Sequence, residues 1–419
     1  PELAEKGLSS LFWNVEKPLV PVLARMEDRG MQIDKERARK VRETFVARAE
    51  VLKQEMVAEV GPFSPDSPVQ VAGILYDTLG LKILGRTDSG APTTAKWALE
   101  RLAEDEPLVD KLLDYRMYTK LVSTYLDKWL SQSSDRIHPS FNQVSQHDEE
   151  DAEGATATGR LSSSGPNFQN VPYHTDAGQL VSACIVAAPG KILVSSDLSQ
   201  IELVIAAIRS EETGFLDALW ENLDIHRRTA SRVFHVAPDD VTPFQRYIGK
   251  GINFSSIYGI RAPLLARRLK VTVSEAQMYL DEFHKAYPRF HEWWYDTAHE
   301  AERLGYATTM WGRRRYLPAL VIAENKDEWY DGDKRADSMA VKGTVADMAK
   351  AILIGLDKAI PGVLVCQVHD AFLGEFDEGD GRKEEVSKVV VEIARQGWGK
   401  YAPLIKADKK EGRNWNELH

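Results

Sequence analysis

The stretch Leu193 to Val204, LVSSDLSQIELV, decides the fold and function that we expect of this chain. A short run of apolar and small residues predicts a strand that ends at Asp197, and a second apolar run, which contains Glu202, follows a turn. A carboxylate at the exposed end of a strand can hold a hard cation, because the rigid backbone fixes where its oxygens point. One carboxylate alone makes a weak site, so a partner is needed.

The partner that we propose lies in the stretch Val363 to Glu375, VLVCQVHDAFLGE. Two β-rich runs flank His369 and Asp370, which is the pattern of a hairpin. If the strand of Asp197 lies beside this hairpin, Asp197 and Asp370 converge, and two close carboxylates require a shared proton or a divalent metal. We interpret the pair as a metal site. From spacing alone, the alternative that both are ordinary turn or cap residues stays open.

Length and composition indicate a globular protein with more than one core. At 419 residues we expect two or three subdomains. No run approaches the length of a membrane span, and the N-terminus lacks a basic region followed by an apolar core. We therefore expect a cytoplasmic or nucleoid location, with an organelle as the alternative. Cys184 and Cys366 lie in apolar runs without metal-ligand spacing, so we interpret them as small core residues.

The net charge of -10 speaks against a protein that coats nucleic acid with its whole surface. It leaves room for a local basic groove. The segment from Phe244 to Lys270 holds no Asp or Glu and these basic residues: Arg246, Lys250, Arg261, Arg267, Arg268 and Lys270. Such uneven charge suits an acidic protein that grips a polyanion in one cleft, although exposed helices also carry such clusters without a partner.

Two further stretches are candidates for DNA contact. A long charged helix is predicted from Asp34 to Val60, and shorter helices, one of which contains Lys120, continue to about Leu130. This helical arm could lie along the backbone of a duplex, or its charged residues could simply form a solvated helix face. The loop TGRLSSSGPNFQNVP, residues 158 to 172, is rich in small and amide side chains. It either runs over the surface or supplies minor-groove hydrogen bonds. Its candidate donors are Arg160, Asn167, Gln169 and Asn170.

Thr242 and Pro243 predict the start of a helix, with an N-cap followed by proline at the first helical position. We expect the helix to run through FQRYIGKGINFSSIYG and to carry a stripe of two cations and two aromatic rings. A nucleoside triphosphate would match this order, because its phosphates could bind the cations and its sugar and flat base could pack on the rings. The alternative is an amphipathic helix with aromatic core residues. The stripe consists of Arg246, Lys250, Phe254 and Tyr258. Downstream, Ser274 to Gln277 predicts another helix start in capping-box form.

Together these stretches resemble the polymerase portion of family A DNA polymerases, the bacterial DNA polymerase I type. The resemblance covers essentially the whole chain, because these motifs follow in family order: YRMYTKLVSTY, TATGRLSSSGPNFQNVP, DLSQIEL, DIHRRTA, RYIGKGINFSSIYG, GRRRYLP, VKGTVAD, QVHDAFLGE and GRNWNELH. It implies an α+β right-hand fold with an antiparallel-sheet palm and helical thumb and fingers. The implied divisions are palm at 1–30, 141–205 and 341–419, thumb at 31–140, and fingers at 206–340.

The resemblance also implies roles. Asp197 and Asp370 match the two aspartates that hold two Mg²⁺ ions, one activating the primer 3′-hydroxyl and one binding the triphosphate. Lys250 is a candidate proton donor to pyrophosphate. Glu202 matches the residue that blocks a 2′-hydroxyl, although Ser199 to Glu202 also predicts a capping box. The implied nucleotide contacts are Arg246, Lys250, Phe254, Tyr258, Glu202, His226 and Gln200. The implied DNA contacts are Arg160, Asn167, Gln169, Asn170, Lys120, Gln367 and His369.

The chain departs from the family pattern at several positions. Ala371 stands where the family usually has Glu, so a third carboxylate near the metals is missing. The other departures are Leu198 for an aromatic residue, Val204 for Arg, Ser255 for Gly, and Lys342 for a Gln that faces the template. These changes bear on fidelity, rate and nucleotide selectivity more than on reaction type. An acidic stretch at 147–154 also looks inserted.

We therefore predict a monomeric, template-directed DNA polymerase that extends primer-template DNA with deoxynucleoside triphosphates and Mg²⁺. We expect no proofreading from these residues, because no exonuclease-like carboxylate set precedes the polymerase motifs. One alternative is a single-subunit RNA polymerase of the same palm class, against which Glu202 argues. The other is a DNA-binding scaffold that has lost catalysis, which Ala371 makes thinkable although both aspartates are present.

Overall fold

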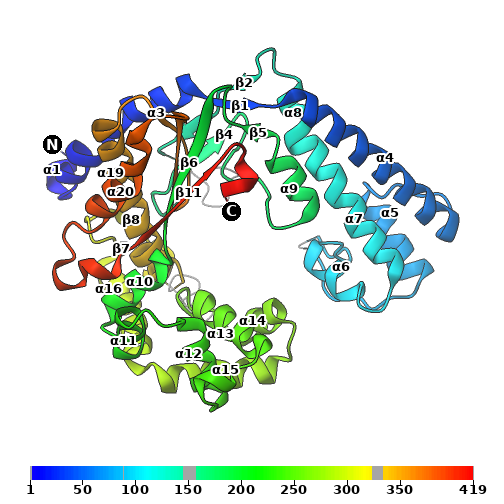
Figure 1. Cartoon of the computed structure of the whole chain (residues 1–419). Coiled ribbons are helices and arrows are strands. Elements are labelled where there is room, and N and C mark those ends of the chain that lie inside the picture. Colours follow the sequence, from blue (N-terminus) through cyan, green and yellow to red (C-terminus); the bar gives the residue numbers. More distant parts are fainter. Residues whose placement is uncertain (1, 88, 145–156, 323–333, 419) are drawn as a thin grey trace. The chain divides into compact units, whose positions relative to one another are not determined.

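The chain forms two compact units in the computed structural model, which describes residues 2–87, 89–144, 157–322 and 334–418 (Figure 1). The first unit takes Pro1–Arg29, Ser140–Ser164 and Val194–Lys410, and the second takes Gly30–Pro139, Gly165–Leu193 and Glu411–His419. Helices and antiparallel sheets are combined, so the predicted α+β class is confirmed. The acidic stretch at 147–154 lies outside the described residues. Among those residues, no helix is both long and apolar enough to cross a bilayer.

A four-stranded sheet positions the predicted carboxylates. Its strands are β6 (Lys191–Leu198), β9 (Leu364–Val368), β10 (Ala371–Asp377) and β11 (Ala407–Gly412), in the order β11-β6-β10-β9. Strands β9 and β10 are antiparallel with Val368 opposite Ala371, so His369 and Asp370 form a two-residue hairpin loop. His369 has a positive φ of 56°, as tight hairpin loops require. The predicted hairpin is therefore confirmed.

The helices of the first unit begin where local capping chemistry allows. Helix α13 starts at Pro243, and Thr242 and Gln245 form a capping box, which confirms the predicted start. For α15 the predicted start at Ser274 was wrong, because Thr272 and Glu275 form the capping box two residues earlier. The α-helices described between β6 and residue 322 are α10 (Ile201–Ser210), α11 (Thr213–Trp220), α12 (Ile225–Phe234), α13 (Pro243–Ser256), α14 (Ala262–Leu269), α15 (Val273–Ala286), α16 (Pro288–Leu304) and α17 (Pro318–Val321).

A buried ionic network fixes the helix that precedes β9. Asp347 and Lys350, on α19 (Thr344–Ala359), are 0% and 1% exposed. Lys350 donates to Glu16 over 2.8 Å, Arg313 donates to both Glu16 and Asp347, and Thr309 donates to Asp347 over 2.6 Å. Charges at such depth are stable only when paired, so these bonds tie α19 to two distant segments. A π-helical stretch, η5 (Met339–Gly343), precedes α19.

The remaining elements of the first unit pack around this sheet and helix. Helix α19 packs against α3 and α20, and β3 pairs with β4 and β7 with β8. Their bounds are α1 (Glu2–Glu5), α2 (Ser9–Leu11), η1 (Phe12–Glu16), α3 (Lys17–Arg29), β3 (Ser140–Asn142), β4 (Ser162–Ser164), η4 (Pro238–Asp240), β7 (Tyr306–Thr308), β8 (Arg314–Tyr316), η6 (Gly381–Glu385), α20 (Val386–Ala394) and η7 (Gly399–Leu404).

The second unit is built on two long helices that run side by side, α4 (Lys35–Val60) and α7 (Pro107–Leu121) (Figure 1). Asp34 caps α4 by accepting from the Arg37 N–H, which confirms the predicted long helix. A stripe of apolar residues, including Phe45, Leu52 and Met56, packs into the core of this unit. The other elements are β1 (Met31–Ile33), α5 (Pro68–Ala72), η2 (Gly73–Thr78), α6 (Lys96–Leu102), η3 (Val122–Leu126), α8 (Asp127–Leu130), β2 (Arg136–Ile137), α9 (Asp176–Ser182), β5 (Ile185–Val186) and η8 (Trp415–Leu418).

Candidate active site

Two carboxylates meet where β6 ends and the β9-β10 hairpin turns. The Leu198 N–H donates to the Asp370 carbonyl oxygen over 3.1 Å, which binds the end of β6 to the hairpin loop. Burial and then the charge of Asp197 raise the pKa of Asp370 to about 7. The pKa of Asp197 is also raised, by loss of hydration and by the charge of Asp408. The structure thus brings Asp197 and Asp370 close enough to repel each other; their roles stay predictions.

Two carboxylates are too few to bind a metal ion by themselves. They suit Mg²⁺ that is also bound by a phosphate of the substrate. Within the described ranges, no group of three or more His, Cys, Asp or Glu side chains could hold an ion. Ala371, at the start of β10, contributes no carboxylate and is buried. Mg²⁺ is usually bound by one or two carboxylates together with substrate phosphates, and a nearby cation would favour the charged form of Asp370. The donor set therefore suits Mg²⁺.

Glu202, in the first turn of α10, has both carboxylate oxygens occupied. Arg160 donates to Oε1 and the Tyr258 hydroxyl donates to Oε2. Burial and the charge of Glu202 raise the pKa of Tyr258, so this hydroxyl stays a protonated donor. The predicted capping box of Ser199 and Glu202 was wrong: Gln200 is the N-cap, with a left-handed φ of 50° and no side-chain bond. The Glu202 side chain is held by distant partners instead of by its own backbone.

The predicted stripe on α13 was wrong at its last position. Helix α13 ends at Ser256, so Tyr258 lies in the turn that follows. Gly259 permits this turn, because it has a φ of 57° and a Cβ there would lie 2.3 Å from the Trp294 ring. Arg246, Lys250 and Phe254 do lie on the helix. The turn is what carries the Tyr258 hydroxyl to Glu202.

Cationic residues of α13 lie beside His226 of α12. Gly249 allows the two helices to approach closely, since a Cβ there would lie 2.4 Å from the His226 carbonyl oxygen. Arg246 donates to Asp224 over 2.6 Å, and Asp224 caps α12 by accepting from the His226 and Arg227 N–H groups. Lys250 is exposed. The structure therefore gathers three predicted phosphate contacts, Arg246, Lys250 and His226, at one end of the helix pair.

His226 is neutral and its tautomer is fixed. Burial, against the opposing charge of Asp224, lowers the pKa of His226 to about 4. The Thr229 hydroxyl donates to the Asn253 side-chain Oδ1 over 2.9 Å, so the side-chain Nδ2 of Asn253 faces His226 Nδ1 at 3.0 Å. Nδ1 is then the acceptor and Nε2 carries the proton. Asn253 and Asp224 were not predicted as site residues, and only their proximity to His226 in the fold reveals them.

The other predicted residues are divided between the two units. In the first, Arg160, Gln367 and His369 line one small cavity, and Gln200 is exposed. Loss of hydration and the charge of Arg160 lower the pKa of His369. Lys120, Asn167, Gln169 and Asn170 belong to the second unit. There Gln169 is buried and its N–H donates to Asn167 over 2.8 Å, while the Asn170 carbonyl accepts from Tyr125.

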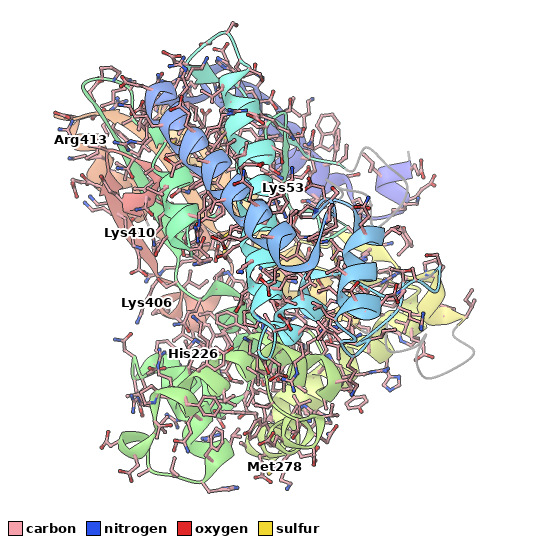
Figure 2. The ribbon with its side chains drawn as sticks, turned by 90° about the vertical axis from the view of Figure 1, so that its right-hand side faces the viewer. Lys53, His226, Met278, Lys406, Lys410 and Arg413 are labelled. Carbon is pink, nitrogen blue, oxygen red and sulfur yellow. The ribbon has the colours of Figure 1, made fainter. Side chains whose placement is uncertain are left out.

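Strand β11 and Lys406, the residue before it, contribute charged residues that the sequence analysis missed. Ser199 donates to Asp408 over 2.8 Å, and Lys406 donates to Asn222 over 2.9 Å. Figure 2 shows Lys410, Lys406 and His226 in succession along one edge of the first unit. The charge of Lys410 opposes that of Asp408 at Asp197. The sequence KADKK, residues 406 to 410, held a signal for these residues. Lys406, Asp408 and Lys410 are charged residues at alternate positions, and alternate residues of a strand lie on one face.

Comparisons with known proteins show the family of the chain. The family model "DNA polymerase family A" matches residues 35–417. "DNA polymerase I, thermostable" of Thermus thermophilus is 36% identical over 421 residues, 98% of this chain and 49% of that protein. DNA polymerase I of Pseudomonas aeruginosa is 35% identical over 427 residues, 99% of this chain and 45% of that protein. The chain spans about half the length of these curated relatives.

A solved structure shares the whole fold. It is described as the POL domain of Pol1 from M. smegmatis in complex with DNA primer-template and dNTP. The match has a TM-score of 0.90 and 32% sequence identity, and it covers 100% of this chain and 73% of that chain. Together with the family match over most of the sequence, this shows that the chain belongs to DNA polymerase family A.

Proposed function

We propose that this chain is a template-directed DNA polymerase that adds deoxynucleoside triphosphates to a primer 3′-hydroxyl. The observation that carries the proposal is the pair of Asp197, at the end of β6, and Asp370, in the β9-β10 hairpin loop beside it. Family membership and the likeness to a polymerase domain described with DNA primer-template and dNTP support it. We further propose that these residues act as a monomer and provide no proofreading.

In this proposal Asp197 and Asp370 hold two Mg²⁺ ions, which would neutralise the reacting phosphate and lower the pKa of the primer hydroxyl. Lys250, exposed on α13, contacts the triphosphate and donates a proton to the leaving pyrophosphate. Arg246 exchanges its bond with Asp224 for a phosphate oxygen. The neutral His226 donates from Nε2 to the phosphates, and Gln200 contacts the nucleotide at the start of α10. These groups position and stabilise charge in an in-line displacement.

Selection of the sugar is assigned to Glu202 and its neighbours. Because Arg160 and Tyr258 occupy both carboxylate oxygens, Glu202 cannot turn away from a ribose 2′-hydroxyl. Phe254 packs on the sugar and Tyr258 lies beside the templating base. This favours a DNA polymerase over the single-subunit RNA polymerase alternative. The scaffold alternative is disfavoured because both carboxylates and the three phosphate contacts are gathered in one unit.

We propose that the duplex is contacted from both units. Arg160, Gln367 and His369 would line its minor groove in the first, with Asn167, Gln169, Asn170 and Lys120 in the second. The fingers (206–340) would then belong to the first unit and nearly all of the thumb (31–140), with helices α4 and α7, to the second, while the predicted palm takes residues from both.

A primer-extension assay tests the function. Four primer-templates that differ only in the templating base are each offered the four deoxynucleotides singly, with Mg²⁺ or with EDTA. We expect the complementary nucleotide to be added in each case, and only with Mg²⁺. Addition that ignores the template, or a preference for ribonucleotides, would overturn the proposal. A mismatched primer that is not shortened would support the absence of proofreading.

A further inference from the structure

Lys342 stands where the family pattern has Gln. It lies against Tyr258, which together with Glu202 and Arg160 forms the group of side chains to which sugar selection is assigned above. Its Nζ lies 3.7 Å from the centroid of the Tyr258 ring. At that distance an ammonium group is attracted to the face of an aromatic ring, and the attraction grows when water is partly excluded. Lys342 is partly buried, and burial lowers its pKa while the charge of Glu202 opposes this change. The lysine therefore interacts with two members of the group at once.

The backbone around Lys342 is held in place. Lys342 lies in the π-helical stretch η5, and insertions of this kind re-aim side chains and occur often at functional sites. Gly343 packs so closely that a Cβ there would lie 2.7 Å from the Thr309 methyl group. Thr309 in turn donates to the buried Asp347 of α19 over 2.6 Å. The position of Lys342 is thus set by the core of the first unit.

These contacts form one connected chain of side chains. Lys342 lies over the Tyr258 ring, the Tyr258 hydroxyl donates to Glu202, and Arg160 holds the other Glu202 oxygen. Tyr258 comes from a turn after α13, and a turn is a less rigid support than a helix. A cation on its ring supplies the support that the backbone there does not.

We propose that Lys342 is a positioning residue for sugar selection, which holds Tyr258 and, through it, the Glu202 carboxylate against the 2′ position of the incoming nucleotide. The inference rests on the polymerase function proposed above. The competing role for Lys342 is a direct contact with the template strand. A template contact would change the affinity for DNA equally for ribo- and deoxynucleotide addition, whereas a positioning role changes the ratio between them.

The test is single-turnover addition of one deoxynucleotide or its ribonucleotide by Lys342→Gln, Lys342→Met and Lys342→Arg. We expect the first two to lower the deoxy-to-ribo ratio of kcat/KM by about 3- to 30-fold, the range that loss of a cation–π contact would give. Lys342→Arg keeps a cation that can stack on a ring and should retain most of the ratio. Lys358→Gln is the matched control, since Lys358 is exposed on α19 and makes the same charge change.

A double substitution isolates the pathway. In a Tyr258→Phe background the hydroxyl link to Glu202 is gone, so adding Lys342→Met should change the ratio by less than about 2-fold. Unchanged ratios in both Lys342→Gln and Lys342→Met, with or without weaker DNA binding, would overturn the inference. If the unsubstituted protein adds no nucleotide at all, the proposed function itself fails. Thermal unfolding of each variant confirms that the compared proteins are folded.

Discussion

The carboxylate pair Asp197 and Asp370 lies in the same unit as Glu202 and its partners Arg160 and Tyr258. The negative charges of the pair repel each other, whereas that of Glu202 is balanced by neighbouring side chains. Asp197 and Asp370 lie at the end of β6 and in the neighbouring hairpin loop, and burial, followed by the charge of Asp197, raises the pKa of Asp370 to about 7. Glu202 is satisfied on both oxygens and has a second cation, Lys342, nearby. The first arrangement is incomplete without a cation and suits chemistry that needs one. The second is complete in the protein itself and suits a rigid steric role.

The largest effect that this contrast predicts is on the chemical step. Asp197→Asn removes one of the two carboxylates, so we expect the rate of deoxynucleotide addition to fall by about a thousand-fold or more, as for the loss of a main electrostatic group. Primer binding should change little, because in the proposed mechanism this carboxylate binds Mg²⁺ and makes no contact with the duplex backbone. Rapid-quench rates and DNA affinity measured on the same preparation separate the two. A rate within ten-fold of the original would contradict the assignment.

Loss of Glu202 should act on selection and not on chemistry. In Glu202→Ala we expect the preference for deoxynucleotides over ribonucleotides to fall by about 100-fold, while the rate of deoxynucleotide addition changes by less than about 10-fold. The physical reason is that the side chain beside the 2′ position is gone while both aspartates remain. Competition between labelled deoxy- and ribonucleotides at one templating base measures this. If Glu202→Ala loses deoxynucleotide and ribonucleotide addition to the same extent, the separate roles that we assign to Glu202 and to the aspartates would be contradicted.

The raised pKa of Asp370 predicts a pH-dependent stability cost. The folded protein binds this proton more tightly than the unfolded chain, whose carboxyl group titrates near pH 4. Between about pH 4 and pH 7, the unfolding free energy without metal should therefore fall relative to that of Asp370→Asn, by a few kcal/mol at most. Chemical denaturation of both proteins across this range measures the difference, and Mg²⁺ should reduce it. A constant difference would show that the pKa of Asp370 is not raised in the folded protein.

The smallest effect concerns the missing third carboxylate. Ala371→Glu adds an acidic side chain beside the pair, so we expect the Mg²⁺ concentration for half-maximal rate to fall by about two- to ten-fold. Without metal, the added repulsion should lower the melting temperature. Mg²⁺ titrations of the extension rate, with Ala371→Gln as an uncharged control, compare the two variants. An equal response to Glu and Gln would mean that charge at this position does not matter.

Sequence patterns predicted the parts of the site that depend on neighbouring residues. The hairpin around Asp370 follows from the two β-rich runs that flank it, and the start of α13 follows from Thr242 as an N-cap followed by Pro243. The capping box at Ser199 failed because Glu202 finds partners 42 and 56 residues away, at Arg160 and Tyr258. Such partners are set by the packing of separate segments, which no local spacing encodes.

The missed residues have the same explanation. Tyr258 leaves the predicted helix in a turn where Gly259 packs against Trp294 of α16, a contact between segments that are distant in the sequence. Asp408 acts on Asp197 only because β11 pairs with β6, and the order of strands in the sheet was not part of the prediction. The resemblance to the family supplied the remaining roles, and it carries no information on a substituted position such as Lys342.

One measurement tests the central claim most directly: single-nucleotide addition to a primer-template with Mg²⁺ by Asp370→Asn and by Asp296→Asn. Asp296 is exposed on α16, so its substitution makes the same chemical change away from the site. We predict that Asp296→Asn adds the complementary deoxynucleotide at the unsubstituted rate and that Asp370→Asn adds almost none. Equal rates for the two variants would contradict the account.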